Sequence, residues 1–430
     1  MIIKNQLKCT LLFVITTVGI LGCNSTPAES KDSALNIEEE YSDEKYSNEK
    51  YSDKKYSDEN ANWLAGSWGI TQRVDGGYKL DQSVDARSAH WVAGAEEIVK
   101  NLPSSGHVIT SFTHPAHAFL FTLRDNDNVD VAAIHPDMVP QLENEQIIFD
   151  VINVYRKAGK KVILYLNAAG PSMITDNDPE NEREIKAAWE EYYNTQWNGD
   201  EGAAWRYLVE GYAKRFDGLV DGYWLDNVRK LPGSLSDFVD TLRSVDPTLA
   251  IGINEKKAYF TAPNDSSEYI YVDSDGLDDQ DDTDYKIIKH VPTNEYEDFT
   301  AGHITPLGRG APPNSWGYEE YTIPDMQDSP WDSYNGNKKA LKHGWFPIRS
   351  TWSSSRSDLV FGIEQAYRFT RKITDAGVGI TWSTTQDKGY MSADEMDIMI
   401  EIENRMIQTP KANYETYQRP VGAYLLGETP

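Results

Sequence analysis

The sequence predicts a single (β/α)8 barrel that follows an N-terminal segment of different composition. Three observations support this fold class: short apolar runs recur after residue 62, amphipathic helical stretches lie between many of them, and the runs number eight. Strands that alternate with helices favour parallel pairing, and eight such units fit a barrel with enlarged loops. The runs are 63–70, 107–114, 161–167, 222–227, 250–255, 297–303, 345–352 and 379–384.

Most of these runs are continuously apolar, as in K-V-I-L-Y-L-N at 161–167. Such strands are typical of parallel sheets that are covered on both faces. A doubly wound open sheet is the alternative fold. It usually carries a glycine-rich G-x-G-x-x-G turn after an early strand, and the sequence contains no such motif.

The stretches between the runs have helical periodicity. In 146–157, apolar residues that include Val151 and Tyr155 share one stripe, and Gly159 follows as a stop signal. Similar patterns occur at 203–216, 234–245 and 362–373.

The N-terminal segment is typical of an exported bacterial lipoprotein. Lys4 and Lys8 precede an apolar run, 11–21, that is too short to span a bilayer. The run ends I-L-G-C, which resembles a lipobox in which Cys23 becomes the lipid-bearing N-terminus; a plain secretory signal is the alternative. We therefore expect a signal peptide at 1–22 and membrane attachment through the lipid, at the outer membrane or cell surface.

Residues 23–61 are expected to form a disordered linker, and residues 62–430 the single (β/α)8 domain. Four five-residue units of the Y-S-D-E-K type fill 41–60, and their period is neither helical nor strand-like. Cys9 and Cys23 are the only cysteines in the chain, so the predicted domain has no disulfide.

The formal net charge of −27 argues against a nucleic-acid partner, because phosphate binding needs basic stripes. Polar residues collect where the predicted strands end, and in a parallel barrel these ends form the active site. A single polar residue there is more often a cap, but this many at matching ends are hard to explain by capping alone. They include His114, His117, Asn167, Asp226, Asn254, His303 and Arg349.

Carboxylates, histidines, asparagines and tryptophans, without a serine or cysteine nucleophile motif, indicate carbohydrate chemistry. Glycosidases place two acidic groups, or an acid and another proton donor, across a sugar ring. In this hypothesis Asp226 is the nucleophile. Its alternative role is to cap the helix that follows.

Several motifs, taken in order, resemble those of glycoside hydrolase family 29 α-L-fucosidases. The resemblance covers most of residues 62–390 and implies the same barrel, with the nucleophile at Asp226. The motifs are G-S-W-G (66–69), H-P-A-H-A-F (114–119), D-G-Y-W-L-D (221–226), N-E-K (254–256), D-F-T-A-G-H (298–303) and S-W-G-Y (315–318).

The chain departs from that family in two ways. It ends soon after the eighth run, where the fucosidases usually carry a β-sandwich, and it holds His303 where many carry an acid/base glutamate. Related endo-acting fucan hydrolases share the barrel and can use histidine. By length and domain content the chain looks most like glycoside hydrolase family 168, endo-fucanases that use an Asp and a Glu; the glutamate would be Glu297 or Glu295.

The resemblance implies endo-acting, retaining hydrolysis of α-L-fucosyl linkages in sulfated fucan, without a cofactor or metal. Asp226 attacks the anomeric carbon, and Glu297 or His303 protonates the leaving oxygen. These two candidates are six residues apart, an even spacing that puts both on one face of a strand, so the sequence does not choose between them. An exo-acting α-L-fucosidase and a non-catalytic glycan-binding lipoprotein are the alternatives.

Sulfated substrate conflicts with the acidic composition, and a local cationic cleft would resolve that conflict, with arginine best suited to sulfate. Each cation can instead be a salt-bridge partner, and each tryptophan a core residue. The substrate-binding candidates are His114, His117, Asn167, Trp224, Asn254, Lys256, Arg309, Trp316, Tyr318, Arg349 and Trp382, with Arg229, Lys257 and Trp352 as further candidates.

The stretch D-S-D-G-L-D-D-Q-D-D-T-D at 273–284 offers clustered oxygen ligands of the kind that Ca²⁺ binds. Its spacing does not match the EF-hand template, which needs a terminal glutamate. We interpret it as a solvated acidic loop, with a calcium site as the alternative.

Overall fold

The protein is described by a computed structural model that covers residues 59–75, 90–113, 123–139, 142–272, 285–303, 316–336, 339–350, 352, 358–419 and 421. Several predictions fall outside these residues. They are the signal peptide, Cys23, the linker repeats, His114, His117, Arg309 and the acidic loop 273–284. None of the helices in the described part is long and apolar enough to cross a membrane.

Seven parallel strands form the main sheet, in the order β14-β15-β1-β2-β3-β4-β5. Neighbours in this order are consecutive in the chain except where β15 pairs with β1, which brings the last strand beside the first. The strands are β1 (Trp68–Asp75), β2 (His107–Thr113), β3 (Lys161–Asn167), β4 (Gly222–Asp226), β5 (Ala250–Ile253), β14 (His343–Pro347) and β15 (Gly379–Ser383).

Residues 298–303 fill the remaining gap between β5 and β14. The Asp298 N–H donates to the Ile251 carbonyl at 2.8 Å, and the Trp345 N–H donates to the Gly302 carbonyl at 2.9 Å. Isolated parallel bridges also join this segment to the other side, Phe299 to Leu341 and His303 to Trp345. The segment therefore occupies the sixth of the eight strand positions of the barrel, and we call each of these positions a stave. The predicted (β/α)8 fold is confirmed.

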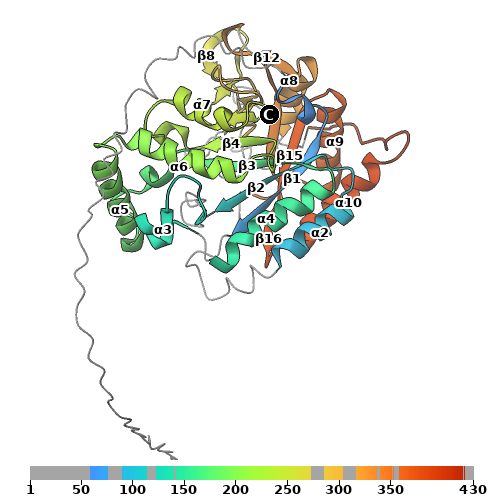
Figure 1. Cartoon of the computed structure of the whole chain (residues 1–430). Helices are drawn as coiled ribbons and strands as arrows, with labels where there is room; N and C mark the ends of the chain where they lie inside the picture. Colours follow the sequence, from blue (N-terminus) through green and yellow to red (C-terminus); the bar gives the residue numbers. More distant parts are fainter. Residues whose placement is uncertain are drawn as a thin grey trace, which may run out of the picture. The chain divides into compact units, whose positions relative to one another are not determined.

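Helices cover the outside of the sheet (Figure 1). Neighbouring helices pack side by side, α2 against α4, α6 against α7 and α9 against α10. The α-helices are α2 (Trp91–Asn101), α3 (Val131–Ile134), α4 (Leu142–Lys157), α5 (Glu180–Gln196), α6 (Glu201–Arg215), α7 (Leu235–Val245), α8 (Ile323–Asp328), α9 (Ile363–Asp375) and α10 (Ala393–Met406).

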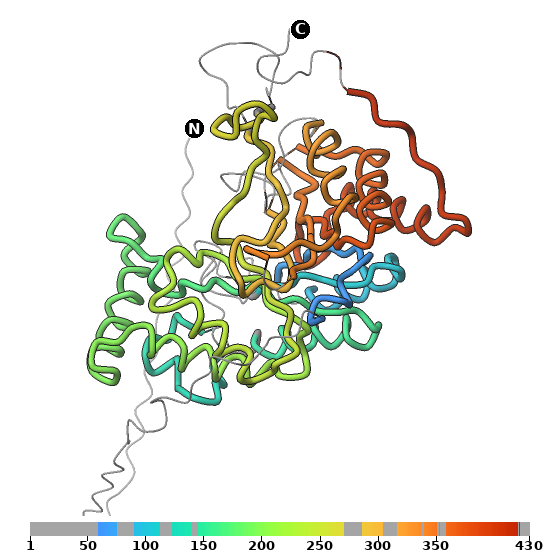
Figure 2. The backbone as a smooth tube through the Cα atoms, turned by 90° about the horizontal axis from the view of Figure 1, so that it is seen from above, coloured from blue at the N-terminus to red at the C-terminus, as the bar shows by residue number. Residues whose placement is uncertain are grey.

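Short antiparallel strand pairs lie outside the main sheet. The pairs β6–β11, β7–β8 and β9–β10 follow β5, and Figure 2 shows this segment as the yellow chain that extends from the body of the domain. The short strands are β6 (Ala258–Tyr259), β7 (Thr261–Ala262), β8 (Asp265–Tyr269), β9 (Tyr271–Val272), β10 (Tyr285–Lys286), β11 (Ile288–Lys289), β12 (Trp331–Ser333), β13 (Lys339–Leu341), β16 (Gln386–Asp387) and β17 (Tyr390–Met391).

Side chains alternate between the two faces of the sheet, so the strands contribute to two hydrophobic clusters, one beneath the helices and one inside the barrel. In β3, Val162 and Leu164 belong to the core beneath the helices, whereas Ile163 belongs to a second cluster inside the barrel. This inner cluster also contains Trp224, Phe299 and residues of most other staves. Because side chains alternate with period two, Tyr165 and Asn167 share the inward side with Ile163, and Asp226 shares it with Trp224.

Candidate active site

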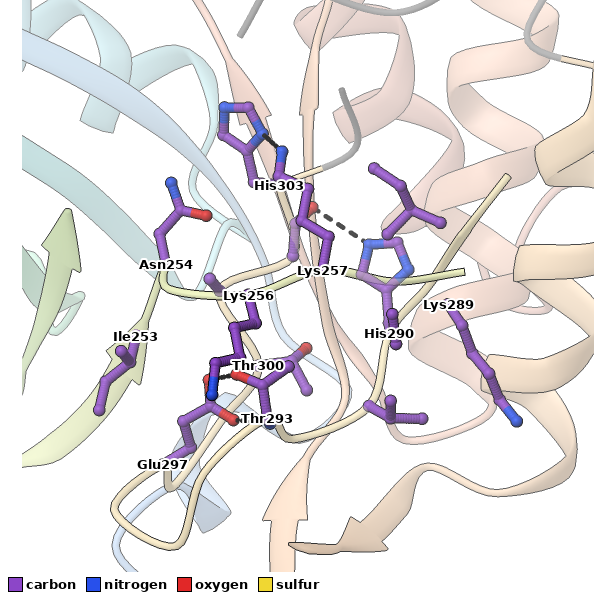
Figure 3. A pocket seen from close by; sticks show the side chains of 15 residues that line it. Ile253, Asn254, Lys256, Lys257, Lys289, His290, Thr293, Glu297, Thr300 and His303 are labelled. Carbon is purple, nitrogen blue, oxygen red and sulfur yellow. Dashed lines mark hydrogen bonds between the residues drawn. The ribbon is translucent and has the colours of Figure 1, made fainter. Parts of the chain in front are cut away.

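The carboxyl ends of the central strands bring four predicted residues to one face of the barrel. Asn167 and Asp226 are register partners at the ends of β3 and β4. The N–H of Asn254 donates to the Leu225 carbonyl at 2.8 Å, which places it directly after β5. His303 ends the sixth stave. Figure 3 shows Asn254 and His303 together at the upper end of a small cavity.

Local sequence explains why β4 ends at Asp226. Gly222 starts the strand where a Cβ would meet the Ala250 carbonyl oxygen at 2.4 Å, so no larger residue fits without a shift. Asn227 then adopts φ +56°, a left-handed conformation that asparagine tolerates better than most residues, and the short helix Val228–Lys230 follows. This turn leaves the half-buried Asp226 carboxylate at the end of the strand.

Both oxygens of the Asp226 carboxylate accept a side-chain hydrogen bond. The Tyr165 hydroxyl donates to Oδ2 at 2.5 Å, and the Asn254 amide donates to Oδ1 at 2.8 Å. Burial and the neighbouring Asp226 charge raise the pKa of Tyr165 well above its usual value, so the phenol stays protonated. Donors to both oxygens fix the orientation of the carboxylate.

Lys257 connects Asp226 to His303. Its ammonium lies 2.7 Å from His303 Nδ1, as the dashed line in Figure 3 marks. Burial lowers the pKa of Lys257 to about 8, while the Asp226 charge opposes that change. A carboxylate, a lysine and an imidazole therefore interact in sequence across the ends of β4, β5 and the sixth stave.

Aromatic rings line this group. The Tyr165 ring stacks on Trp224 with centroids 5.3 Å apart, and Trp224 packs edge-on against Trp345 at 4.5 Å. The His303 ring stacks on Trp352 at 4.4 Å. The Trp224 indole N–H donates to the Ala301 carbonyl at 2.8 Å, which ties the sixth stave to β4. Trp352 is partly exposed, and such a ring suits the apolar face of a sugar. Trp224 and Trp345 are buried, at 1% and 8% exposure, so the predicted substrate-binding residue Trp224 packs inside the barrel and offers no open face for a sugar.

Glu297 lies at the other end of the cavity from His303 (Figure 3). The residue is 2% exposed, and its carboxyl group accepts from the Thr293 N–H at 2.7 Å, within the turn that precedes the sixth stave. Burial raises the pKa of Glu297 to about 8. Glu295 is exposed in the same turn. Glu297 therefore precedes the stave that His303 ends, and its bonds hold it to its own turn.

Several substrate-binding candidates lie elsewhere. Trp382 is fully buried and its indole N–H donates to Thr370 of α9 at 3.0 Å, because its strand parity points it outward to the helices. Trp316 and Tyr318 are also buried, at 1% and 3% exposure. Neither offers an open face for a sugar in this conformation, so the structure does not bring these three rings to the site.

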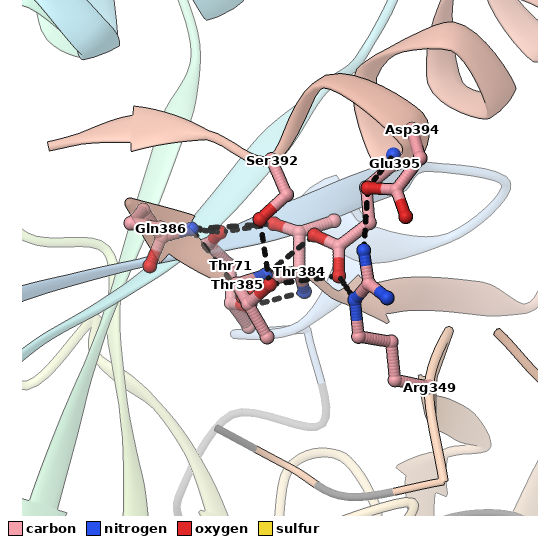
Figure 4. Close-up of polar contacts among 8 residues, drawn as sticks. All are labelled: Thr71, Arg349, Thr384, Thr385, Gln386, Ser392, Asp394 and Glu395. Carbon is pink, nitrogen blue, oxygen red and sulfur yellow. Dashed lines mark hydrogen bonds and ion pairs between the residues drawn. The ribbon is translucent and has the colours of Figure 1, made fainter. Parts of the chain in front are cut away.

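Arg349 is held inside the fold instead of facing a cleft. Its Nε donates to Glu395 at 2.5 Å, and its Nη2 donates to Asp394 (Figure 4). Only 4% of the residue is exposed. Asn167 is buried as well, and its Oδ1 accepts from the Ala169 N–H at 3.1 Å, so it shapes the turn beside Asp226. Lys256 remains at the rim, with 65% of its side chain exposed.

Sequence reasoning missed Tyr165 and Trp345. Tyr165 carried a usable signal, because it is two residues before Asn167 and therefore shares its face of the strand. Trp345 carried a weaker signal, since nothing in the neighbouring sequence distinguishes it from other core tryptophans. In the described structure its indole nitrogen is buried without a hydrogen-bond partner. No group of three His, Cys, Asp or Glu residues in the described part of the chain is placed to hold a metal ion.

A (β/α)8 barrel that presents a doubly hydrogen-bonded carboxylate beside an imidazole, among aromatic rings, is the architecture of a glycoside hydrolase. Comparison with known proteins specifies the family. Residues 58–429 match the family model described as "Endo-alpha(1,4)-fucoidanase Mef1", and the chain belongs to this family. A search of curated proteins finds no match.

Solved structures agree with this assignment. The chain is 68% identical to the endo-fucoidan hydrolase P5AFcnA of glycoside hydrolase family 107, with a TM-score of 0.80, over 86% of this chain and 99% of that one. MfFcnA4 and MfFcnA9 of the same family share the fold at 14% identity and a TM-score of 0.60 each. The alignments cover 80% of this chain and 53% and 63% of theirs.

The chain is an endo-fucoidan hydrolase, which confirms the predicted glycosidase class and the endo-acting cleavage of fucan. The narrower suggestion of family 168 differs from family 107, to which these relatives belong. The suggestion of family 168 depended on length and domain content, which several barrel families share.

Proposed function

We propose that this enzyme cleaves α(1,4)-fucosyl linkages of sulfated fucan with retention of configuration, using Asp226 as nucleophile and His303 as acid/base. The observation that carries the proposal is the linked arrangement of Asp226, Lys257 and His303 at the carboxyl ends of neighbouring staves. The α(1,4) linkage follows the description of the matched family.

Asp226 is suited to nucleophilic attack because its geometry is fixed before substrate binds. The Tyr165 and Asn254 donors occupy one lone pair on each oxygen and leave the other lone pairs for the anomeric carbon. In the first step a carboxylate oxygen bonds to the anomeric carbon as the glycosidic bond breaks. Water then displaces the ester from the same side on which the leaving group departed, which retains the configuration.

His303 is favoured over Glu297 by position. His303 and Asp226 both interact with the Lys257 ammonium. Glu297 instead accepts a hydrogen bond from Thr293 at the opposite end of the cavity. An imidazole has a pKa near neutrality, which suits a group that first donates and later accepts a proton.

Cations at the rim of the site support a sulfated substrate. Lys256 is exposed at the rim, and exposed Arg229 donates through Nε to the Glu255 carbonyl at 2.8 Å, which leaves its guanidinium end beside the rim. These cations attract sulfate locally, although the chain as a whole carries a charge of −27. We also propose that Cys23 carries a lipid that anchors the enzyme to the cell envelope, supported by the I-L-G-C motif.

A single experiment tests the catalytic proposal. The soluble 62–430 fragment is incubated with sulfated and with desulfated fucan, the products are sized, and the anomer first formed is identified by NMR. We expect a ladder of oligosaccharides with α reducing ends, formed faster from sulfated fucan. An initial β anomer would contradict retention, and equal rates on both polymers would contradict sulfate recognition.

A further inference from the structure

We propose that Lys257 is a proton-relay partner of His303, so that the acid/base of this enzyme is a lysine–histidine pair rather than the imidazole alone. The inference rests on the proposed role of His303 and extends it to a second residue. Its basis is the 2.7 Å contact between Lys257 Nζ and His303 Nδ1, together with the electrostatic interaction of the same ammonium with Asp226.

The contact fixes the tautomer of His303. An ammonium group has three donors and no acceptor, so His303 Nδ1 must accept when Lys257 is charged. The ring proton of the neutral imidazole is then on Nε2, the nitrogen on the opposite side of the ring from Lys257 (Figure 3). Such an imidazole can donate its Nε2 proton only if Nδ1 takes up another one.

Lys257 can supply that proton. Burial has brought its pKa to about 8, close enough to neutral pH for transfer to an imidazole nitrogen. As the glycosidic bond breaks, the leaving oxygen takes the Nε2 proton and Nδ1 takes a proton from Lys257, which becomes a neutral amine. Asp226 simultaneously becomes a neutral ester, so all charges lost in this step are accounted for.

The loss of the Asp226 charge helps to drive the transfer. Asp226 is the main group that favours the charged form of Lys257, and Arg229 opposes it. Once Asp226 is esterified, that support disappears and proton release from Lys257 becomes easier. In the second step water attacks the anomeric carbon and gives a proton to Nε2, the Nδ1 proton returns to Lys257, and the Asp226 carboxylate is restored.

The charged and titratable neighbours of Lys257 are consistent with this role. Asp226 and Arg229 face it from β4 and the following short helix, His303 from the sixth stave, and His290 from the segment after β11. Burial lowers the pKa of His290 to about 4, so His290 is neutral at working pH and does not compete for the proton.

The test compares two lysine variants in the full-length protein. Lys257→Met removes the proton and the charge, whereas Lys257→Arg keeps a charged donor that does not release its proton. If Lys257 relays a proton, both variants lose kcat on fucan, by on the order of 10²-fold or more, with KM changed much less. Lys257→Arg at near wild-type kcat would show that the residue only orients His303, and would overturn the relay.

The pH profile gives a second, independent readout. The wild-type acid form disappears as Lys257 loses its proton, so the alkaline limb of kcat should fall near pH 8. In Lys257→Met the imidazolium alone must be the acid, and the limb should move down toward the ordinary histidine pKa of about 6.5. An alkaline limb that stays in place in Lys257→Met would also overturn the proposal.

A fucan oligosaccharide with a dinitrophenyl leaving group separates this inference from the proposed function. That leaving group needs no proton, so both Lys257→Met and His303→Gln should release dinitrophenol at wild-type burst rates while they fail on fucan. A His303→Gln enzyme that degrades fucan normally would overturn the role of His303 itself. A normal Lys257→Met enzyme beside an inactive His303→Gln enzyme would overturn the relay alone.

Discussion

The Tyr165 hydroxyl lies 2.5 Å from Oδ2 of Asp226. Tyr165 lies two residues before the end of β3 and Asp226 ends the neighbouring strand β4, both on the inward side of the barrel. The Asn254 amide donates to the other oxygen. A phenol that stays protonated and an amide thus hold the carboxylate from two sides. The carboxylate that we propose as the nucleophile is therefore oriented by its protein neighbours before any sugar arrives.

Tyr165→Phe should lower kcat by about 10- to 100-fold with little change in KM. The substitution removes one hydrogen bond to a charged group, worth about 1.5–3 kcal/mol, and leaves the stacking on Trp224 in place. Initial rates on fucan measure the effect. Tyr155→Phe is the matched control: this buried hydroxyl bonds Gln72 at 2.7 Å behind the sheet, and its loss should reduce stability without reducing kcat.

Asp226→Ala should abolish activity, by at least about 10³-fold, while the protein still folds. Asp221→Asn is the control at the other end of β4. Asp221 bonds Lys161 at 2.7 Å and the Val162 N–H at 2.9 Å, so its change should lower the melting temperature and leave kcat intact. Circular dichroism and reducing-end assays measure both variants. Wild-type rates for Asp226→Ala would refute the assignment.

Glu297→Gln should flatten the dependence of stability on pH. Burial raises the pKa of Glu297 from about 4.5 to about 8, so the folded state binds a proton that the unfolded state releases. The stabilisation is complete below pH 4.5 and is lost as pH rises through 8, with a slope of at most about 1.4 kcal/mol per pH unit.

Denaturant unfolding of Glu297→Gln and wild type between pH 5 and 9 measures this difference. The variant should gain relative stability as the pH rises, and its kcat on fucan should remain close to wild type. A loss of kcat by 10²-fold or more, with the fold intact, would restore Glu297 as the acid/base.

Arg349→Met should destabilise the domain by about 3–5 kcal/mol without raising KM for sulfated fucan. The substitution leaves the fully buried Glu395 without the guanidinium that pairs with it. The double variant Arg349→Met/Glu395→Gln should recover part of that loss. A stable Arg349→Met protein with a much higher KM for sulfated fucan would instead place Arg349 in the binding site.

The sequence alone predicted the barrel because its signal is local and repeated. Continuous apolar runs such as 161–167 are typical of strands covered on both faces, and the helical stripes between them favour parallel pairing. Asp226 was also predictable, since a carboxylate that ends an apolar strand meets the active-site face of a barrel. The sixth stave was predicted by its motif, although few of its residues form regular strand pairs.

Only the tertiary structure decided which polar and aromatic residues meet at the site. The alternation of side chains along β15 points Trp382 outward to α9, and Arg349 pairs with the buried carboxylate of Glu395. Neither contact can be recognised from one stretch of sequence. Along the sequence, Asp226 is 61 residues from Tyr165, 31 from Lys257 and 77 from His303. These three residues belong to three other staves or to the loops that follow them. Their grouping depends on how the staves close into a barrel, because contacts between distant strands are set by register and curvature rather than by local pattern.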